Sequence, residues 1–175
     1  MAEDNPLINR VANSGLITIN LEDYFPKEEI IDFDIKQFLF MEMILKEKDF
    51  RTSLKEQDWK SYEGKILAVH CSVDAIIPTW AYMLISANAS PFVADLYFGQ
   101  RSGYIQQYFD GILEDMNCEQ HQDKRVVIKG CSDKEVPPSA YMKLTSRLRP
   151  FAQSIMFGEP CSTVPIFKRP RVIKK

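Results

Sequence analysis

Three cysteines, Cys71, Cys131 and Cys161, have the residue type and the positions to hold a metal ion or to act as reactive thiols. Each follows a short apolar run that is typical of a β-strand. In an open α/β sheet, ligands bind beyond the carboxyl ends of the strands, so a parallel sheet would bring these thiols to one edge. Three thiolates with one open position suit zinc, or an iron–sulfur cluster with one iron free for substrate.

Carboxylates close to these cysteines extend the predicted site. Asp74 and Glu159 are candidates for a fourth ligand or for a general base. A zinc ion with an open position would lower the pKa of bound water to about 7 and allow hydrolysis, whereas a free iron of a cluster would act as a Lewis acid in a dehydration. The residues do not choose between zinc and a cluster, and they assign no reaction.

Other interpretations of the same cysteines stay open. Free cysteine is among the most buried residue types, so the three thiols are equally typical of packing in a non-enzymatic scaffold or interaction protein. A single reactive thiol at a helix N-terminus is a third interpretation, because the helix dipole stabilises a thiolate. The segment at His70 and Cys71 is superficially similar to a phosphatase loop, but Ile77 occupies the position that needs arginine, which excludes this chemistry.

Two further segments carry residue types that are found in binding sites. Cys118 and His121 have the spacing of half a metal site, but no second pair lies nearby, and the polar residues around them predict a solvated loop. The basic tail at residues 167–175 could contact nucleic acid, yet the net charge of −2 favours an ordinary solvated tail. Nucleic acid is therefore not an expected partner.

The composition indicates a folded globular protein. Of the 175 residues, 45% are hydrophobic and 26% are charged. The start of the chain lacks the basic and apolar stretches of a signal peptide, and no apolar run approaches the roughly 18 residues that cross a bilayer. We therefore expect a cytoplasmic protein with reduced cysteines and without a membrane partner.

Strand patterns and helix patterns alternate along the chain and must position these residues. This order predicts an α/β fold of three layers, with helices on both faces of a mainly parallel sheet. We expect a flexible leader at residues 1–13, a single α/β domain at 14–166 and the basic tail. Residues 35–46 fit either a buried helix or a strand. Strands are predicted at 15–20, 66–69, 93–98, 126–128 and 154–157, and helices at 47–57, 78–87, 102–115 and 138–148.

An internal repeat is the strongest signal in the sequence. Residues 65–100 align with residues 125–159, which predicts a duplicated strand–helix–strand unit with a pseudo-twofold axis. The Ala-Tyr-Met string in each helix is typical of packing, and the duplicated faces could bind a partner or a second copy of the chain. Cys71, Ser72, Pro78, Ala81, Tyr82, Met83, Pro91, Phe92, Phe98 and Gly99 recur as Cys131, Ser132, Pro137, Ala140, Tyr141, Met142, Pro150, Phe151, Phe157 and Gly158.

Several strings resemble a bacterial family that is known only as a domain of unknown function. They are CSVDAIIPTWAYM at 71–83, VIKGC at 127–131, GEPCSTVP at 158–165 and, upstream, EKDFR at 47–51. The resemblance covers nearly the whole chain beyond the leader and implies no activity. In the family's pattern the cysteines that match Cys71, Cys131 and Cys161 belong to the motifs, whereas the Cys118 region does not.

Overall fold

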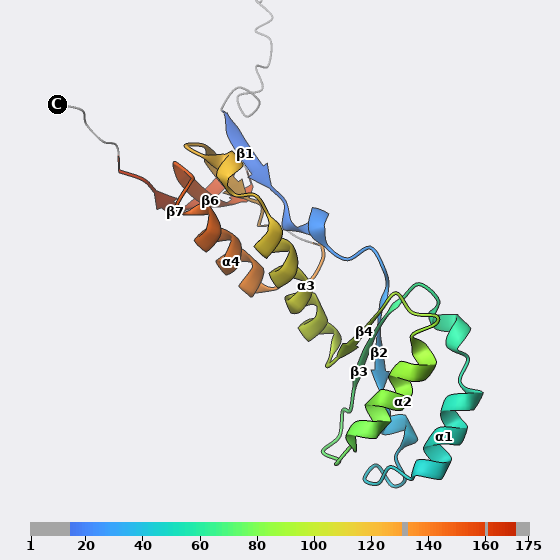
Figure 1. Ribbon diagram of the computed structural model, residues 1–175. Helices are drawn as coiled ribbons and strands as arrows, with labels where there is room; N and C mark the ends of the chain where they lie inside the picture. The colour runs from blue at the N-terminus through green and yellow to red at the C-terminus, as the bar shows by residue number, and fades with distance from the viewer. Residues whose placement is uncertain (1–14, 131–132, 160, 171–175) are drawn as a thin grey trace, which may run out of the picture. The chain divides into compact units, whose positions relative to one another are not determined.

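The computed structural model describes residues 15–130, 133–159 and 161–170. The chain divides into two compact units, of which unit 2 is Pro26–Gln107 and unit 1 contains the segments before and after it. Each unit has its own sheet, and parallel pairing dominates both, so the predicted α/β class is confirmed (Figure 1). A single domain was expected at residues 14–166. That expectation stays a prediction, because two compact units can belong to one domain.

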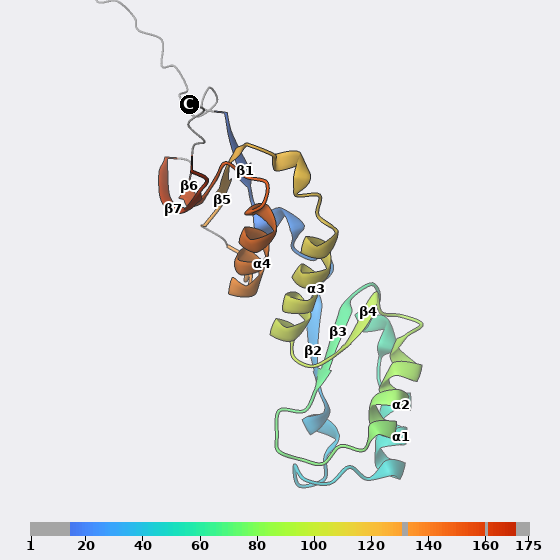
Figure 2. The same cartoon turned by 60° about the vertical axis from the view of Figure 1, so that its left-hand side comes forward.

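The sheet of unit 2 contains the strands β2 (Ile30–Asp34), β3 (Ile66–His70) and β4 (Asp95–Phe98) in the order β2–β3–β4, all parallel. The helices α1 (Glu47–Glu56) and α2 (Thr79–Ala89) lie on one side of this sheet (Figures 1 and 2). Short helical turns, η2 (Ile35–Phe38) and η3 (Trp59–Tyr62), link the strands to α1. The predicted helix at 47–57 therefore matches α1 closely.

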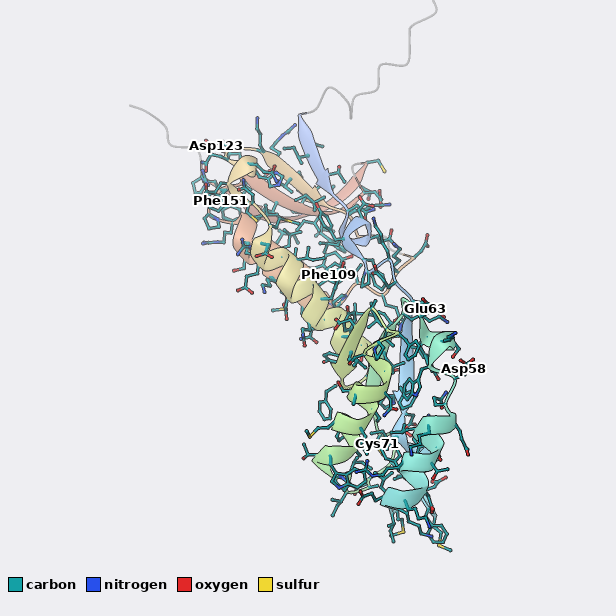
Figure 3. The ribbon with its side chains drawn as sticks, turned by 45° about the vertical axis from the view of Figure 1, so that its right-hand side comes forward. Asp58, Glu63, Cys71, Phe109, Asp123 and Phe151 are labelled. Atoms are coloured by element: carbon teal, nitrogen blue, oxygen red, sulfur yellow. The ribbon has the colours of Figure 1, made fainter. Side chains whose placement is uncertain are left out.

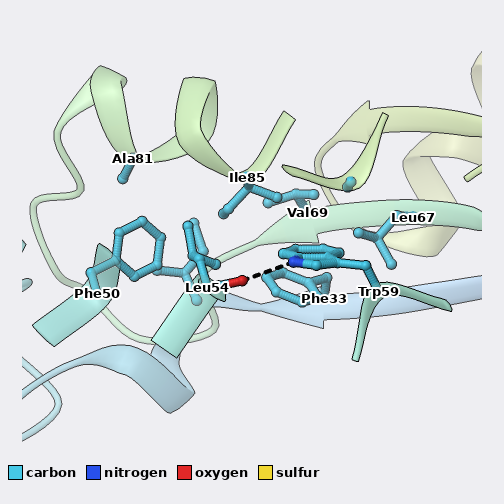
Figure 4. Packing of buried hydrophobic residues seen from close by; sticks show 10 residues of the cluster. Phe33, Phe50, Leu54, Trp59, Leu67, Val69, Ala81 and Ile85 are labelled. Atoms are coloured by element: carbon cyan, nitrogen blue, oxygen red, sulfur yellow. Dashed lines mark hydrogen bonds between the residues drawn. The ribbon is translucent and has the colours of Figure 1, made fainter. Parts of the chain in front are cut away.

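The core of unit 2 fills the space between this sheet and the two helices (Figure 4). Phe33 of β2 stacks on Trp59 with ring centroids 5.7 Å apart, and the Trp59 indole N–H donates a hydrogen bond to the Leu54 carbonyl over 2.8 Å. The Tyr97 ring, on the opposite face of β4 by strand alternation, contacts Tyr104 of α3 (Arg101–Asp115) at 5.6 Å. Helices thus contact both faces of this sheet, as the three-layer prediction requires.

The sheet of unit 1 contains β1 (Leu16–Ile19), β5 (Arg125–Ile128), β6 (Ser154–Glu159) and β7 (Ser162–Lys168) in the order β1–β5–β6–β7. Only β7 is antiparallel among these described strands. Two short turns, η1 (Leu21–Tyr24) and η4 (Glu119–His121), complete the unit with α4 (Pro138–Leu148) and the end of α3. The Lys143 ammonium of α4 donates to the Asp110 carbonyl of α3 over 2.7 Å, which joins these helices.

The two predicted repeat copies fall in different units and share one strand register. Val69 of β3 pairs with Phe98 of β4, and Ile128 of β5 pairs with Phe157 of β6. The number of sequence positions that separates a residue of unit 2 from its counterpart in unit 1 is the same for both strands of the pair. The same backbone hydrogen bonds recur: Ala94 donates to Lys65 over 2.7 Å and Gln153 to Lys124 over 2.8 Å. Origin of the units by duplication stays a prediction.

This register changes one detail of the sequence alignment. At the constant spacing of the strands, the counterpart of Cys71 is Gly130, one residue away from the match expected from the sequence. The alignment opened a one-residue gap in the following loop to pair two cysteines, and the paired strands need no gap. The strand register therefore matches Cys71 with Gly130 and not with Cys131.

Several segments differ from the sequence-based expectations. Residues 35–46 are neither a long helix nor a strand, since η2 is followed by a turn that an isolated bridge between Phe40 and Ile44 closes. The strands β2 and β7 were not predicted, and β7 includes Phe167 and Lys168, which were expected in the tail. The predicted leader lies outside the described residues. Within the described part of the chain, no helix has the length and apolar character to cross a membrane.

Candidate functional site

Cys71 directly follows β3 and lines a pocket at the carboxyl edge of the unit 2 sheet (Figure 3). The pocket has a volume of about 490 Å³, and Tyr82 and Gln100 also line it. The half-buried thiol donates a hydrogen bond to the Val73 carbonyl over 3.4 Å. Burial and, second, the negative charge of a Cys71 thiolate raise the pKa of the Tyr82 phenol. The arrangement offers a thiol and a phenol to a ligand in one pocket.

His70 does not form a catalytic pair with Cys71. Its Nδ1 atom lies 3.8 Å from the Asp32 Oδ1 atom, on the sheet face to which Asp32 and Ala68 both point. Cys71 instead packs against the core cluster on the α2 side of the sheet. Both residues line the same pocket, but the Cys71 thiol donates to the Val73 carbonyl and not to the imidazole, so these two described residues do not form a hydrogen-bonded Cys–His pair.

Asp34 connects the end of β2 to the loop that begins at Cys71. Its Oδ1 atom accepts hydrogen bonds from the N–H groups of Lys36, at 2.9 Å, and Ser72, at 3.0 Å. Burial alone would raise the pKa of Asp34, but these bonds, a side-chain hydrogen bond with Ser72 and the charge of His70 outweigh it and lower the pKa below 3.8. The carboxylate is thus a structural acceptor that fixes the edge of the pocket.

The three predicted metal-binding cysteines are not brought together within one unit. Cys71 belongs to unit 2, Cys161 is exposed in the turn between β6 and β7 of unit 1, and Cys131 lies outside the described residues. Of the further candidates, Asp74 is exposed in the loop after Cys71. In the part of the chain that the structure describes, no group of three or more His, Cys, Asp or Glu side chains could hold a metal ion.

Glu159 has a feature of its own at the end of β6. Its Oε1 atom is buried and has no hydrogen-bond partner among the described residues. A buried carboxylate oxygen without a partner costs free energy, so natural proteins usually supply a donor or a cation. The residue precedes the turn that contains Cys161.

Cys118 and His121 are buried, and the prediction of a solvated loop at these positions is wrong. The turn η4 places the two side chains inward while the intervening Glu119 and Gln120 stay exposed. Burial lowers the pKa of His121, and its Nδ1 atom has no hydrogen-bond partner among the described residues. Cys118 and His121 are three positions apart, and side chains with this spacing lie on the same side of a 3₁₀ turn. This spacing was the available sequence signal that both side chains face inward.

Apolar side chains at matched positions are exposed in both units. Met83 follows Tyr82 in α2 and is 66% exposed, and its counterpart Met142 in α4 is 75% exposed. The Tyr82 ring lies 5.0 Å from Phe98, which is 72% exposed, in an edge-to-face arrangement. The Ala-Tyr-Met strings were expected to pack in the core, and this is true of the buried alanines but not of the methionines.

Unit 1 has the same arrangement beside a larger apolar pocket. The Tyr141 and Phe157 rings lie 5.7 Å apart, again edge to face. Together with Met142 of α4 and Ile166 of β7 they line a pocket of about 510 Å³. We name Tyr82, Met83 and Phe98 the unit 2 apolar surface, and Tyr141, Met142 and Phe157 the unit 1 apolar surface. The sequence signal that could have identified both surfaces was the recurrence of Tyr-Met in the helix and of Phe near the end of the following strand in each copy.

The fold and these surfaces define the class as a parallel α/β protein with two similar units. A family model described as "Protein of unknown function (DUF2480)" matches residues 5–169. The chain belongs to this family, in agreement with the resemblance seen in the sequence. No curated protein and no solved structure matches the chain.

Proposed function

We propose that this chain is a non-enzymatic interaction protein whose two apolar surfaces bind protein chains. The observation that carries the proposal is the exposure of Met83, Phe98 and Met142 at matched positions of two units. A single exposed apolar side chain is ordinary in a soluble protein. The same exposed side chains beside an apolar pocket in both units are not explained by the core, and such clusters mark protein-binding sites.

The chemistry of these surfaces fits protein recognition better than catalysis. Methionine and aromatic residues are enriched in the centres of protein interfaces, because they bury much apolar area and adapt to their partner. The unit 1 pocket is lined mainly by apolar side chains, and Arg149 is its charged member. A partner with apolar side chains and an acidic group would satisfy both features.

Site-specific cross-linking tests the proposal in cells. A photoreactive amino acid in place of Met83 or Met142 should give discrete adducts with a protein, whereas the same group at the exposed positions Lys48 and Gln120 should not. The cross-linked protein, once purified, should bind the wild-type chain and lose at least about tenfold in affinity for a Met142→Asp variant. Adducts that are absent from both surfaces, or equally abundant at the control positions, would contradict the proposal.

A second candidate function is binding of zinc or an iron–sulfur cluster, in which Cys131, Cys161 and Glu159 act as ligands in unit 1. The buried Glu159 oxygen without a partner among the described residues supports it, because a bound cation would supply the missing interaction. Cys71, with Asp74 beside it, is the third cysteine of the predicted ligand set and lines the pocket of unit 2.

Metal and acid-labile sulfide analysis of protein purified without oxygen or chelators tests this candidate. About one zinc per chain, or iron with sulfide and a visible chromophore, should be present and should be lost in Cys131→Ser and Cys161→Ser variants. Cys118→Ser is the matched control, because that thiol is buried outside the ligand set. Folded protein without metal or sulfide would exclude the candidate, and loss of metal in the Cys118 control as well would show an indirect effect.

A further inference from the structure

The matched strands β4 and β6 differ in what lies beside them. β6 pairs with β5 on one side and with the antiparallel β7 on the other, with Phe157 opposite Val164. Among the described residues, β4 pairs only with β3. The edge of unit 2 at β4 therefore corresponds to the position that β7 occupies in unit 1.

The exposed fractions of Phe98 and Phe157 show how much of the aromatic ring the additional strand β7 covers. Phe157, beside β7, is 38% exposed, whereas Phe98, at the unpaired edge, is 72% exposed. Ile166 of β7 lines the same pocket as Phe157, so the strand covers part of the unit 1 apolar surface. In unit 2, the corresponding pocket of about 220 Å³ beside Phe98 and Leu96 has no such cover among the described residues.

The backbone of β4 is suited to accept a further strand. The Gly99 N–H donates to the Val69 carbonyl of β3 over 2.9 Å, and the Leu96 N–H donates to the Asp95 side chain instead of to β3. Alternation along the strand therefore directs the backbone polar groups of Leu96 and Phe98 towards the open edge. An unpaired edge with apolar side chains is a template for pairing with another chain. Proline and lysine, which protect such edges, occur in β7 but not in β4.

We infer that a second copy of this chain covers the β4 edge, with the two β4 strands antiparallel about a twofold axis. This inference rests on the proposed function and names the partner of the unit 2 apolar surface. With Tyr97 opposite Tyr97 of the second copy, Leu96 lies opposite Phe98 on the apolar side of the sheet. That contact reproduces the pairing of Phe157 with Val164 in unit 1.

A second copy fits better than an unrelated strand because the edge is self-complementary. β4 is a short strand, Asp95–Phe98, and a twofold arrangement makes every contact of it twice. Each copy supplies one apolar residue, Leu96, for the exposed Phe98 of the other. The pairing also joins the two three-stranded sheets into one continuous sheet.

The oligomeric state of the full chain in solution tests the inference. Sedimentation and light scattering over a wide range of concentration should show a reversible dimer, and a Phe98→Asp variant should be monomeric or dimerise about tenfold more weakly or worse. Because Phe98 is mostly exposed, circular dichroism should show an unchanged fold. The matched control is Ile76→Asp, at a residue of unit 2 that is 93% exposed and lies outside both apolar surfaces, and this variant should dimerise as the wild type does.

Hydrogen exchange identifies the surface that dimerises. Amides of residues 94–98 should exchange more slowly in the dimer than in the Phe98→Asp variant, while those of residues 154–158 should not differ. A monomeric wild type, or a dimer that Phe98→Asp leaves intact, would overturn the inference. If either of these results is found, cross-links from Met83 and Met142 to a different protein would still support the proposed function. If such cross-links are also absent, the inference and the proposed function are both wrong.

Discussion

At the scale of single residues, the ends of β1 and β2 show how polar side chains shape each unit. Asn20 directly follows β1 and Asp34 is the last residue of β2, and each accepts a hydrogen bond from the backbone N–H two residues later. Such caps satisfy N–H groups that a helical turn leaves without a partner. Asp34 also accepts from the Ser72 N–H, so this carboxylate holds the loop that carries Cys71. Polar residues at strand ends can therefore be structural, and position alone does not assign them chemistry.

His121 should make the stability of the protein depend on pH. Its pKa is lowered in the folded state by burial, so the unfolded chain, with a pKa near 6.5, binds the proton more readily. The stabilising contribution of the neutral imidazole is complete above pH 6.5 and is lost as the pH falls through the folded pKa. Urea unfolding between about pH 7 and pH 5 should therefore show a falling free energy of unfolding.

Cys118, which is buried beside the same turn as His121, provides a matched control for this prediction. A His121→Phe variant should flatten the pH dependence in this range, with a slope change of at most about 1.4 kcal/mol per pH unit. A Cys118→Ser variant, which keeps His121, should keep the wild-type slope. Equal slopes in the wild type and in His121→Phe would show that the buried ring is not the titrating group.

At the scale of elements, the pairing of β6 with β7 depends on a glycine. Gly158 has φ +122°, and a Cβ atom there would lie 2.6 Å from the Ser162 carbonyl oxygen of β7. Its counterpart Gly99 has φ +136°, but the nearest atom is the end of the Tyr97 ring at 2.7 Å, which can move. The additional strand of unit 1 therefore makes the glycine requirement stricter than it is in unit 2.

Three alanine variants should rank in stability according to this difference. Gly158→Ala should destabilise by about 1–3 kcal/mol or more, and Gly99→Ala by less, because it suffers only the backbone strain. Gly111→Ala in α3 has open space around the new methyl group and should stabilise by up to about 1 kcal/mol. Free energies of unfolding from urea titrations measure all three. An equal loss for both strand-end glycines would show that β7 does not constrain Gly158.

Local patterns predicted the helices well and the strands in part. The helix at 138–148 was predicted with the bounds that α4 has, because proline at its start and apolar spacing are local signals. β7 was missed because Pro165 argues against a strand, yet proline is tolerated at a sheet edge. The three-cysteine site stays a prediction: it assumed a single sheet, and the arrangement of the strands in two sheets cannot be read from local periodicity. The burial of Cys118 and His121 was missed because it comes from tertiary contacts, which local patterns do not show.

At the scale of the whole molecule, the chain completes unit 2 without interruption but builds unit 1 from two segments. All strands of the unit 2 sheet and both helices of its core lie between residues 26 and 107. Unit 1 needs β1 from the start of the chain, because β1 pairs with β5 along its whole length. The two units should therefore differ in whether one continuous piece of chain can fold.

A fragment of residues 26–115, which keeps α3 entire, should fold by itself, since it contains its own sheet, core and helices and has the size of a small domain. Both tryptophans, Trp59 and Trp80, lie in it, so fluorescence should report a cooperative urea transition. The fragment 108–175 lacks β1, leaves the edge of β5 unpaired and should remain unfolded by circular dichroism. Adding residues 1–25 to it through a short linker should restore folding, because the missing strand returns to β5. A 26–115 fragment without a cooperative transition would show that unit 2 depends on the remainder of the chain for its stability.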